Sequence, residues 1–220
     1  MRQATNLGSL IQPVTSFESL LELRETLKNK AKTADLFTKP ALMAVQEALE
    51  QLISLAGKYH CVVANPPYMG GSKMNTELSE FVKIIYPISK ADLFSCFIER
   101  SLAFVPKYGY NGLVTMESWM FLSSFEKMRT SICSGKTITS LIHMPYLGKG
   151  GTSLGINFGT EMAVIRNSKT NKYIGLYDRI AYYETDEEGI PLAFPTINKY
   201  YKTTTQDNFS KIPGAPLAYW

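Results

Sequence analysis

Apolar residues recur at helical spacing along the first quarter of the chain. The first stripe follows a candidate capping box, Thr15 with Glu18, and the second follows Pro40, which suits the first position of a helix. The two stripes consist of Leu20, Leu23 and Leu27, and of Leu42, Val45, Leu49 and Leu52. Gly57 is a plausible end for the second helix. Residues 1–57 are therefore predicted to form a helical segment of ordinary packing helices.

From residue 58 the pattern changes to short apolar runs separated by helical stretches. Residues 91–105 and 125–132 predict helices. Buried strands are predicted at residues 60–64, 112–116, 138–144, 162–166 and 173–177. Strands that alternate with helices indicate an α/β sheet with crossover connections, which we assign to residues 58–182. Because such sheets bind ligands beyond the carboxyl ends of their strands, we expect the functional site there.

The last part of the chain is polar and rich in proline. An acidic stretch, residues 184–188, has the composition of a solvated turn. We therefore expect residues 183–220 to be a polar linker.

Composition narrows the class of protein only a little. Apolar residues make up 45% of the 220 residues, which is enough for a globular core, and the net charge of +4 permits contact with nucleic acid without requiring it. The cysteines, Cys61, Cys96 and Cys133, are odd in number and far apart, so neither a disulfide framework nor a metal site is expected. With no signal-like or membrane-spanning apolar run, a cytoplasmic location is expected.

The strongest chemical signal is Asn65-Pro66-Pro67-Tyr68, directly after the first predicted strand. The lone pair of an adenine amino group is delocalised into the ring, so this group is a poor nucleophile. Acceptors on its two N–H bonds, the Asn65 side-chain oxygen and the Pro66 carbonyl, would favour a more reactive nitrogen. The two prolines fix the backbone and remove competing N–H donors. Tyr68 can then stack on a base that has been flipped out of the duplex.

Simpler interpretations of this motif exist. A proline pair can form a rigid loop or a polyproline ligand. The common Pro-Pro-x-Tyr spacing of such ligands is not met, because Tyr68 directly follows Pro67.

Residues 59–219 resemble the gamma-type N6-adenine DNA methyltransferases, and most closely the large methyltransferase of BREX phage-defence systems, the PglX type. The stretches that carry the resemblance are YHCVVANPPYMGGSKMN, SKADLFSCFIER, NGLVTMESWMFLSSFEKMR, LIHMPYLGKGGTSLGINFGTEMAVIRN and KIPGAPLAYW. The resemblance implies a partial Rossmann-like sheet and S-adenosylmethionine as methyl donor. It also implies double-stranded DNA as substrate, with other BREX or restriction-modification subunits as candidate partners.

The resemblance also assigns roles to residues. Asn65, Pro66, Pro67 and Tyr68 match the catalytic motif. The cofactor's adenine pocket is matched by Asp92, Leu93 and Phe94, although Asp92 equally suits a helix cap.

A second set of assignments concerns the substrate. Phe158 resembles the aromatic residue that sandwiches the flipped base opposite Tyr68, although Phe158 equally suits the core. Lys73, and Lys149 in the glycine-rich stretch 148–153, are candidates for contact with DNA phosphates.

The chain departs from the family pattern in one respect. We find neither the glycine-rich turn for the methionine part of the cofactor nor the acidic residue for its ribose in residues 1–58. We therefore expect an internal fragment of a longer enzyme, with an incomplete cofactor site and no activity of its own. Two alternatives stay open: a non-catalytic DNA-binding or assembly module, and methylation of a glutamine amide in a protein.

Overall fold

The computed structural model describes residues 4–144, 158–187, 190–193 and 195–219. The chain divides into two compact units, residues 1–59 and residues 60–220, which we call the helical unit and the sheet unit. The division falls close to the boundary expected at residue 57. Lys149 and the stretch 148–153 lie outside the described residues.

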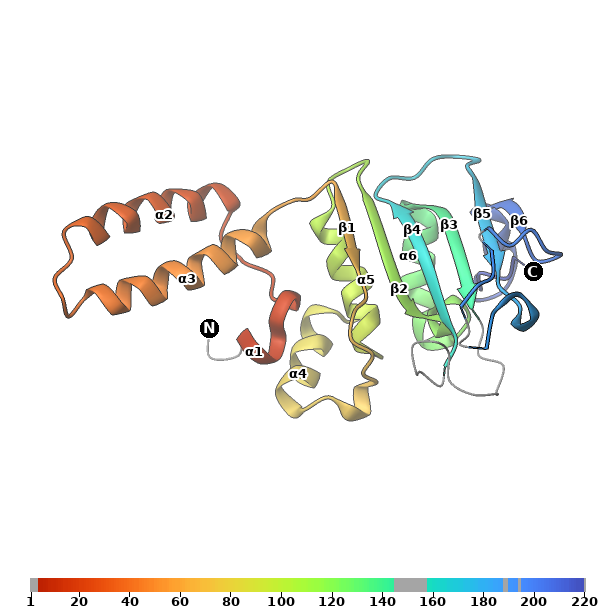
Figure 1. Ribbon diagram of the computed structural model, residues 1–220, viewed down its shortest axis with the longest axis horizontal. Coiled ribbons are helices and arrows are strands. Elements are labelled where there is room, and N and C mark those ends of the chain that lie inside the picture. Colours follow the sequence, from red (N-terminus) through yellow and green to blue (C-terminus); the bar gives the residue numbers. More distant parts are fainter. Residues whose placement is uncertain (1–3, 145–157, 188–189, 194, 220) are drawn as a thin grey trace. The chain divides into compact units, whose positions relative to one another are not determined.

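The helical unit is built around a hairpin of two helices, α2 (Phe17–Lys32) and α3 (Lys39–Ala56), preceded by α1 (Ala4–Leu7) and the turn η1 (Gly8–Leu10) (Figure 1). The cap of α2 is Ser16 and not Thr15, because the Ser16 hydroxyl accepts the backbone N–H of Ser19 at 3.2 Å. Pro40 lies in the first turn of α3, and Gly57 caps its end, as predicted. The hairpin core consists of Leu20, Leu49 and Ile53.

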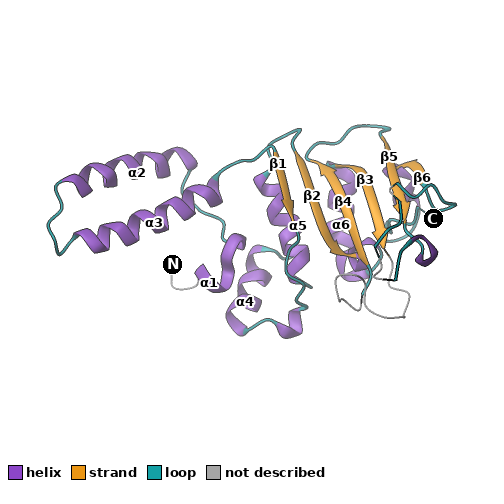
Figure 2. Ribbon diagram, in the orientation of Figure 1, coloured by secondary structure: helices purple, strands orange, loops and turns teal. Residues whose placement is uncertain are grey.

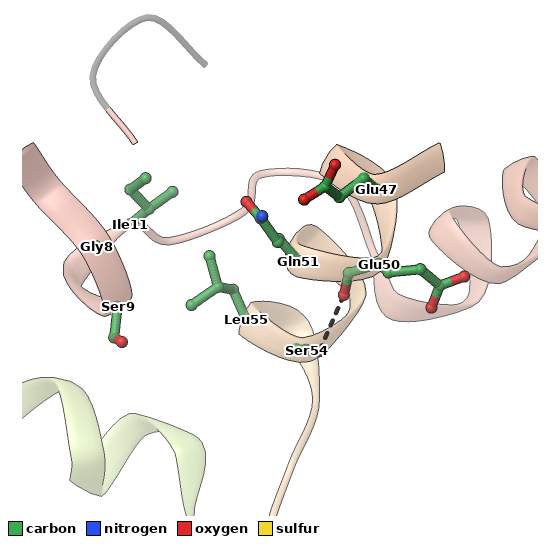
Figure 3. Close-up of a pocket in the computed structure, with 8 residues that line it drawn as sticks. All are labelled: Gly8, Ser9, Ile11, Glu47, Glu50, Gln51, Ser54 and Leu55. Carbon is green, nitrogen blue, oxygen red and sulfur yellow. Dashed lines mark hydrogen bonds between the residues drawn. The ribbon is translucent and has the colours of Figure 1, made fainter. Parts of the chain in front are cut away.

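A groove of about 470 Å³ lies in the helical unit between η1 and α3 (Figure 3). Its lining residues are Gly8, Ser9, Ile11, Glu47, Glu50, Gln51, Ser54 and Leu55. The Ser54 hydroxyl donates to the Glu50 carbonyl at 2.9 Å, within α3 itself. Both ionisable groups of the lining are carboxylates, so the groove is poorly suited to the phosphates of nucleic acid.

The sheet unit contains a six-stranded sheet with the order β1-β2-β4-β3-β5-β6. Its strands are β1 (Cys61–Ala64), β2 (Tyr110–Met116), β3 (Thr137–Met144), β4 (Thr160–Arg166), β5 (Ile174–Arg179) and β6 (Lys202–Thr205). The five predicted strands are all present, and the α/β fold class is confirmed. β6 was not predicted, because its polar sequence carries no apolar alternation.

The sheet is mixed, and its pairing gathers several strand ends at one edge. β1 pairs in parallel with β2, and β3 in parallel with β5, whereas β4 runs antiparallel between β2 and β3. The carboxyl ends of β1, β2 and β3 therefore lie at the same edge as the beginning of β4. Gly159, which precedes β4, accepts the backbone N–H of Glu117, which follows β2, at 2.9 Å.

Helices α5 (Leu93–Phe104) and α6 (Glu126–Gly135) cover one face of the sheet, as Figure 2 shows. Leu113, Leu141 and Ala163 point from neighbouring strands into the core beneath these helices, where they meet Ile98 and Ile132. A further helix, α4 (Thr76–Ile85), follows the Asn65–Tyr68 loop and was not predicted; Asn75 caps it by accepting the Leu78 N–H at 2.9 Å.

The expectation of a polar linker over residues 183–220 is wrong. Those residues include β6, which extends the sheet by pairing with β5. They also place Phe209, Leu217 and Tyr219 in the main core. The segment is polar overall because most of its residues face solvent, but a few apolar anchors are enough to fold it onto the sheet.

Among the helices that the structure describes, none combines the length and the apolar character needed to cross a membrane.

Candidate active site

The Asn65–Tyr68 loop begins directly after β1, at the carboxyl edge of the sheet. Asn65 and Pro67 are exposed, Pro66 is buried, and Tyr68 is half-buried against the main core. Two consecutive prolines restrict the backbone here, so the loop leaves β1 in one direction. The loop therefore holds a polar side chain at the surface and an aromatic ring just below it.

Tyr68 holds Asn65 through its hydroxyl group. The Tyr68 oxygen lies 2.6 Å from Oδ1 of Asn65 and 3.1 Å from the carbonyl oxygen of Val114 in β2. A phenol has one proton, so it donates to one of these acceptors at a time. Burial, and to a smaller extent the charge of Glu161, raises the pKa of Tyr68, which keeps the hydroxyl protonated as a donor.

Phe158 lies beside Tyr68 in the structure. The two rings meet edge to face, with centroids 5.2 Å apart and an interplanar angle of 79°. A base sandwiched between two rings needs roughly 7 Å, twice the spacing of ~3.4 Å between stacked bases, and parallel planes. The Tyr68 and Phe158 rings therefore leave no room for a base between them in this arrangement.

Asp92 ties this loop to the beginning of α5. Its Oδ1 accepts the backbone N–H of Met69 at 3.0 Å and that of Phe94 at 3.2 Å, and the Leu93 N–H donates to the Met69 carbonyl at 2.9 Å. Burial raises the pKa of Asp92, although these backbone donors and the charge of Lys73 oppose the shift. Asp92 is thus a helix cap that also fixes the residue after Tyr68.

The three residues assigned to the cofactor pocket differ in their exposure. Leu93 and Phe94 are buried in the core, and the Phe94 ring lies edge-on to Tyr68 with centroids 6.4 Å apart. Asp92 alone is partly exposed, and both N–H groups that donate to its carboxylate, those of Met69 and Phe94, bond to Oδ1. A partly exposed carboxylate could accept the amino and hydroxyl donors of a cofactor, whereas Phe94 supports the Tyr68 ring. Lys73 lies exposed in the turn that follows the loop.

Three further residues, which the sequence analysis did not single out, form a chain of hydrogen bonds close to Phe158. Glu117 follows β2, and its Oε2 lies 2.5 Å from Nε2 of His143 in β3. Nδ1 of His143 lies 3.1 Å from the hydroxyl of Tyr219. No sequence motif joins these positions; the order of the strands brings them together.

Glu161 in β4 has a buried carboxyl group, and the sequence analysis did not single it out either. Its Oε1 accepts hydrogen bonds from the Thr115 hydroxyl and, at 2.7 Å, from the Trp119 indole. Its Oε2 is buried and has no partner among the described residues. Burial raises the pKa of Glu161 to about 7, against the opposing effect of the two donors. The sequence did carry a sign of this residue, because Glu161 alternates with Ala163 and Ile165 on the core side of β4. Within the described residues, no cluster of His, Cys, Asp and Glu could hold a metal ion.

The chain is similar to known methyltransferases in sequence. The chain is 37% identical over 218 residues to the adenine-specific methyltransferase BrxX of Escherichia coli O9:H4 (strain HS), an alignment that covers 99% of this chain and 18% of the relative. It is 36% identical over 177 residues to the adenine-specific methyltransferase PglX of Lacticaseibacillus casei (strain Zhang), covering 76% of this chain and 14% of the relative. The chain therefore spans less than a fifth of the length of these relatives.

Solved structures share the fold at much lower sequence identity. A type I restriction-modification methyltransferase subunit from Streptococcus thermophilus superposes with a TM-score of 0.50 at 10% identity, covering 72% of this chain and 37% of that one. A modification subunit of a putative type I restriction enzyme from Vibrio vulnificus YJ016 also gives 0.50, at 11% identity, covering 68% and 34%. Residues 6–148 match the family described as Eco57I restriction-modification methylase, and the chain belongs to that family.

Proposed function

We propose that this chain carries the catalytic residues of an enzyme that methylates the N6 amino group of adenine in double-stranded DNA, within a restriction-modification or BREX-type phage-defence system. The observation that carries the proposal is the meeting of the Asn65 acceptor with the Tyr68–Phe158 ring pair at the carboxyl edge of the sheet. The family and the two adenine-specific relatives support the same reaction.

In this proposal the chain's own residues bind and orient the base. Tyr68 and Phe158 stack on its two faces once their edge-to-face contact opens. The Asn65 side-chain oxygen and the Pro66 carbonyl each accept a hydrogen bond from one N–H group of the amino group. These contacts direct the nitrogen lone pair out of the ring plane, toward the methyl donor.

S-adenosylmethionine would supply an electrophilic methyl group at this site. The Oδ2 of Asp92 is the group of this chain that we expect to contact it, and the Asp92 cap fixes that carboxylate relative to Met69. Lys73, exposed beside the same loop, is a candidate for a DNA phosphate. Lys149 has the same proposed role, outside the described residues. Other subunits of the same defence system are the expected protein partners.

The test compares Asn65→Ala with the wild type in the intact protein that contains this sequence. Host DNA from a strain that lacks the gene is incubated with labelled S-adenosylmethionine, and N6-methyladenine is counted after digestion to nucleosides. Loss of one positioned acceptor should lower the rate by about 100-fold or more. Asn208→Ala, an exposed asparagine bonded to Thr204, is the matched control. Undiminished transfer by Asn65→Ala, or label found in glutamine, would overturn the proposal.

A further inference from the structure

A chain of hydrogen bonds runs from the C-terminal segment of the sheet unit to the residue beside the stacking aromatic. Tyr219 contacts His143 at 3.1 Å, His143 contacts Glu117 at 2.5 Å, and the backbone N–H of Glu117 donates to Gly159 at 2.9 Å. Gly159 directly follows Phe158. The side chains of His143 and Tyr219 are buried, and that of Glu117 is mostly so.

We propose that Tyr219 is a positioning residue for the base slot, and that it acts through His143 and Glu117 on the backbone that holds Phe158. This inference rests on the proposed function, since it assigns how one wall of the slot is held. None of the three residues needs to touch the base.

The direction of the hydrogen bonds makes the chain specific. As a carboxylate, Glu117 can only accept a hydrogen bond, so the Nε2–H of His143 is the donor. When Nδ1 of His143 carries no proton, it is an acceptor, and the Tyr219 hydroxyl donates to it. Burial raises the pKa of Tyr219 strongly, which keeps that hydroxyl protonated. Tyr219 therefore holds the imidazole ring whose Nε2 contacts Glu117.

Glu117 is also in close contact with the backbone at the slot. A Cβ added to Gly159 would collide with the carboxyl group of Glu117, so the carboxylate lies directly on the glycine. The hydrogen bond between the backbones of Glu117 and Gly159 is a second contact that holds these two residues together. The Glu117 side chain is thus placed to fix the backbone at Gly159 and, through it, the adjoining Phe158.

Tyr219 also has an ordinary packing role, which has to be separated from the proposed one. Its ring stacks on Tyr177, with centroids 5.3 Å apart and planes at 27°. The Tyr177 hydroxyl is buried and has no hydrogen-bond partner among the described residues. Tyr177→Phe is therefore a matched control: it removes a buried hydroxyl from the same ring stack without touching the chain to Glu117.

The experiment measures methyl transfer to host DNA from a strain that lacks the gene, with the intact protein and labelled S-adenosylmethionine. Tyr219→Phe should lower kcat about fivefold, the effect of one lost hydrogen bond, with KM for the methyl donor unchanged. Tyr177→Phe should match the wild type. Glu117→Ala should lower kcat at least as much as Tyr219→Phe, and the double variant should be no slower than Glu117→Ala alone, because residues that act through one another are not additive.

Glu117→Gln keeps an oxygen that can accept from His143, so it should retain most of the activity that Glu117→Ala loses. Fluorescence of 2-aminopurine, placed at an adenine that the host strain methylates, reports base stacking directly and should change in Tyr219→Phe but not in Tyr177→Phe. Equal behaviour of the two tyrosine variants, or additive losses in the double variant, would overturn the inference. If the wild type methylates no adenine, or Asn65→Ala stays active, the proposed function itself falls and this inference falls with it.

Discussion

The hydroxyl of Tyr68 lies 2.6 Å from the side-chain oxygen of Asn65, so the residue proposed to stack on the base occupies the acceptor proposed to bind its amino group. The same ring meets Phe158 edge to face. In the proposed function, an incoming base therefore replaces two contacts that these residues make with one another. Because an amide oxygen has two lone pairs, Asn65 can accept from the base before Tyr68 releases it.

Tyr68 variants separate the ring from the hydroxyl. Tyr68→Phe keeps the stacking ring and frees the Asn65 oxygen, so methyl transfer should stay within about threefold of the wild type. Tyr68→Ala removes the ring, and loss of one stacked base contact, about 1–3 kcal/mol, should weaken kcat/KM by roughly 5- to 150-fold. Methyl transfer to host DNA measures both, with the exposed Tyr183→Ala as control. A Tyr68→Ala protein with the kcat/KM of the wild type would contradict a stacking role.

Asp92 variants separate the helix cap from the proposed cofactor contact. Asp92→Asn keeps an oxygen for the N–H groups of Met69 and Phe94, whereas Asp92→Ala loses both bonds. Asp92→Ala should therefore cost about 1 kcal/mol of unfolding free energy, and Asp92→Asn much less. If the carboxylate contacts the cofactor, both variants should bind S-adenosylmethionine more weakly in calorimetry of the intact protein. Unchanged binding by Asp92→Asn would leave the residue with its capping role alone.

Glu161 should make the stability of the protein depend on pH. Its pKa is about 7 in the folded state, against an ordinary value of 4.5, so between these two pH values the folded protein binds more protons than the unfolded one. The free energy of unfolding should then fall as the pH rises from about 4.5 to 7, by roughly 1–3 kcal/mol. Glu161→Gln keeps an oxygen for Thr115 and Trp119 and should remove this slope.

Urea denaturation at several pH values measures the Glu161 effect. The exposed Glu80→Gln removes a charge elsewhere on the sheet unit and should leave the slope as it is in the wild type. Parallel curves for Glu161→Gln and the wild type would show that the buried carboxyl does not titrate in this window.

Gly159 and Gly135 form a matched pair for alanine substitution. A Cβ at Gly159 would collide with the carboxyl group of Glu117, whereas a Cβ at Gly135, at the end of α6, meets nothing within 4 Å. Gly159→Ala should cost about 1–3 kcal/mol of stability and slow methyl transfer. Gly135→Ala should be neutral or stabilising by up to about 1 kcal/mol. Thermal unfolding with methyl-transfer assays distinguishes them, and equal stability of the two variants would contradict the close contact.

Sequence analysis singled out those residues of the candidate site that lie close together along the chain or in a recognisable stretch. The Asn65–Tyr68 loop could be predicted because a motif and an apolar strand adjoin one another, and Phe158 because it belongs to a recognisable stretch. Glu117, His143 and Tyr219 could not, because their contacts depend on the insertion of β4 between β2 and β3. Apolar periodicity predicts that strands exist but not their order. Tyr219 was also hidden by the polar composition of its surroundings.

The residues proposed to form the base slot and to hold it in place come from almost the whole length of the sheet unit, which has a consequence for synthesis. The ribosome releases the Asn65–Tyr68 loop early, whereas Tyr219 emerges only after every strand of the sheet has been made. Contacts between distant positions form slowly, and domains fold as units during translation. If Tyr219 positions Phe158 as proposed, a nascent chain that already exposes the Asn65–Tyr68 motif should hold a base less firmly until residue 219 has left the exit tunnel.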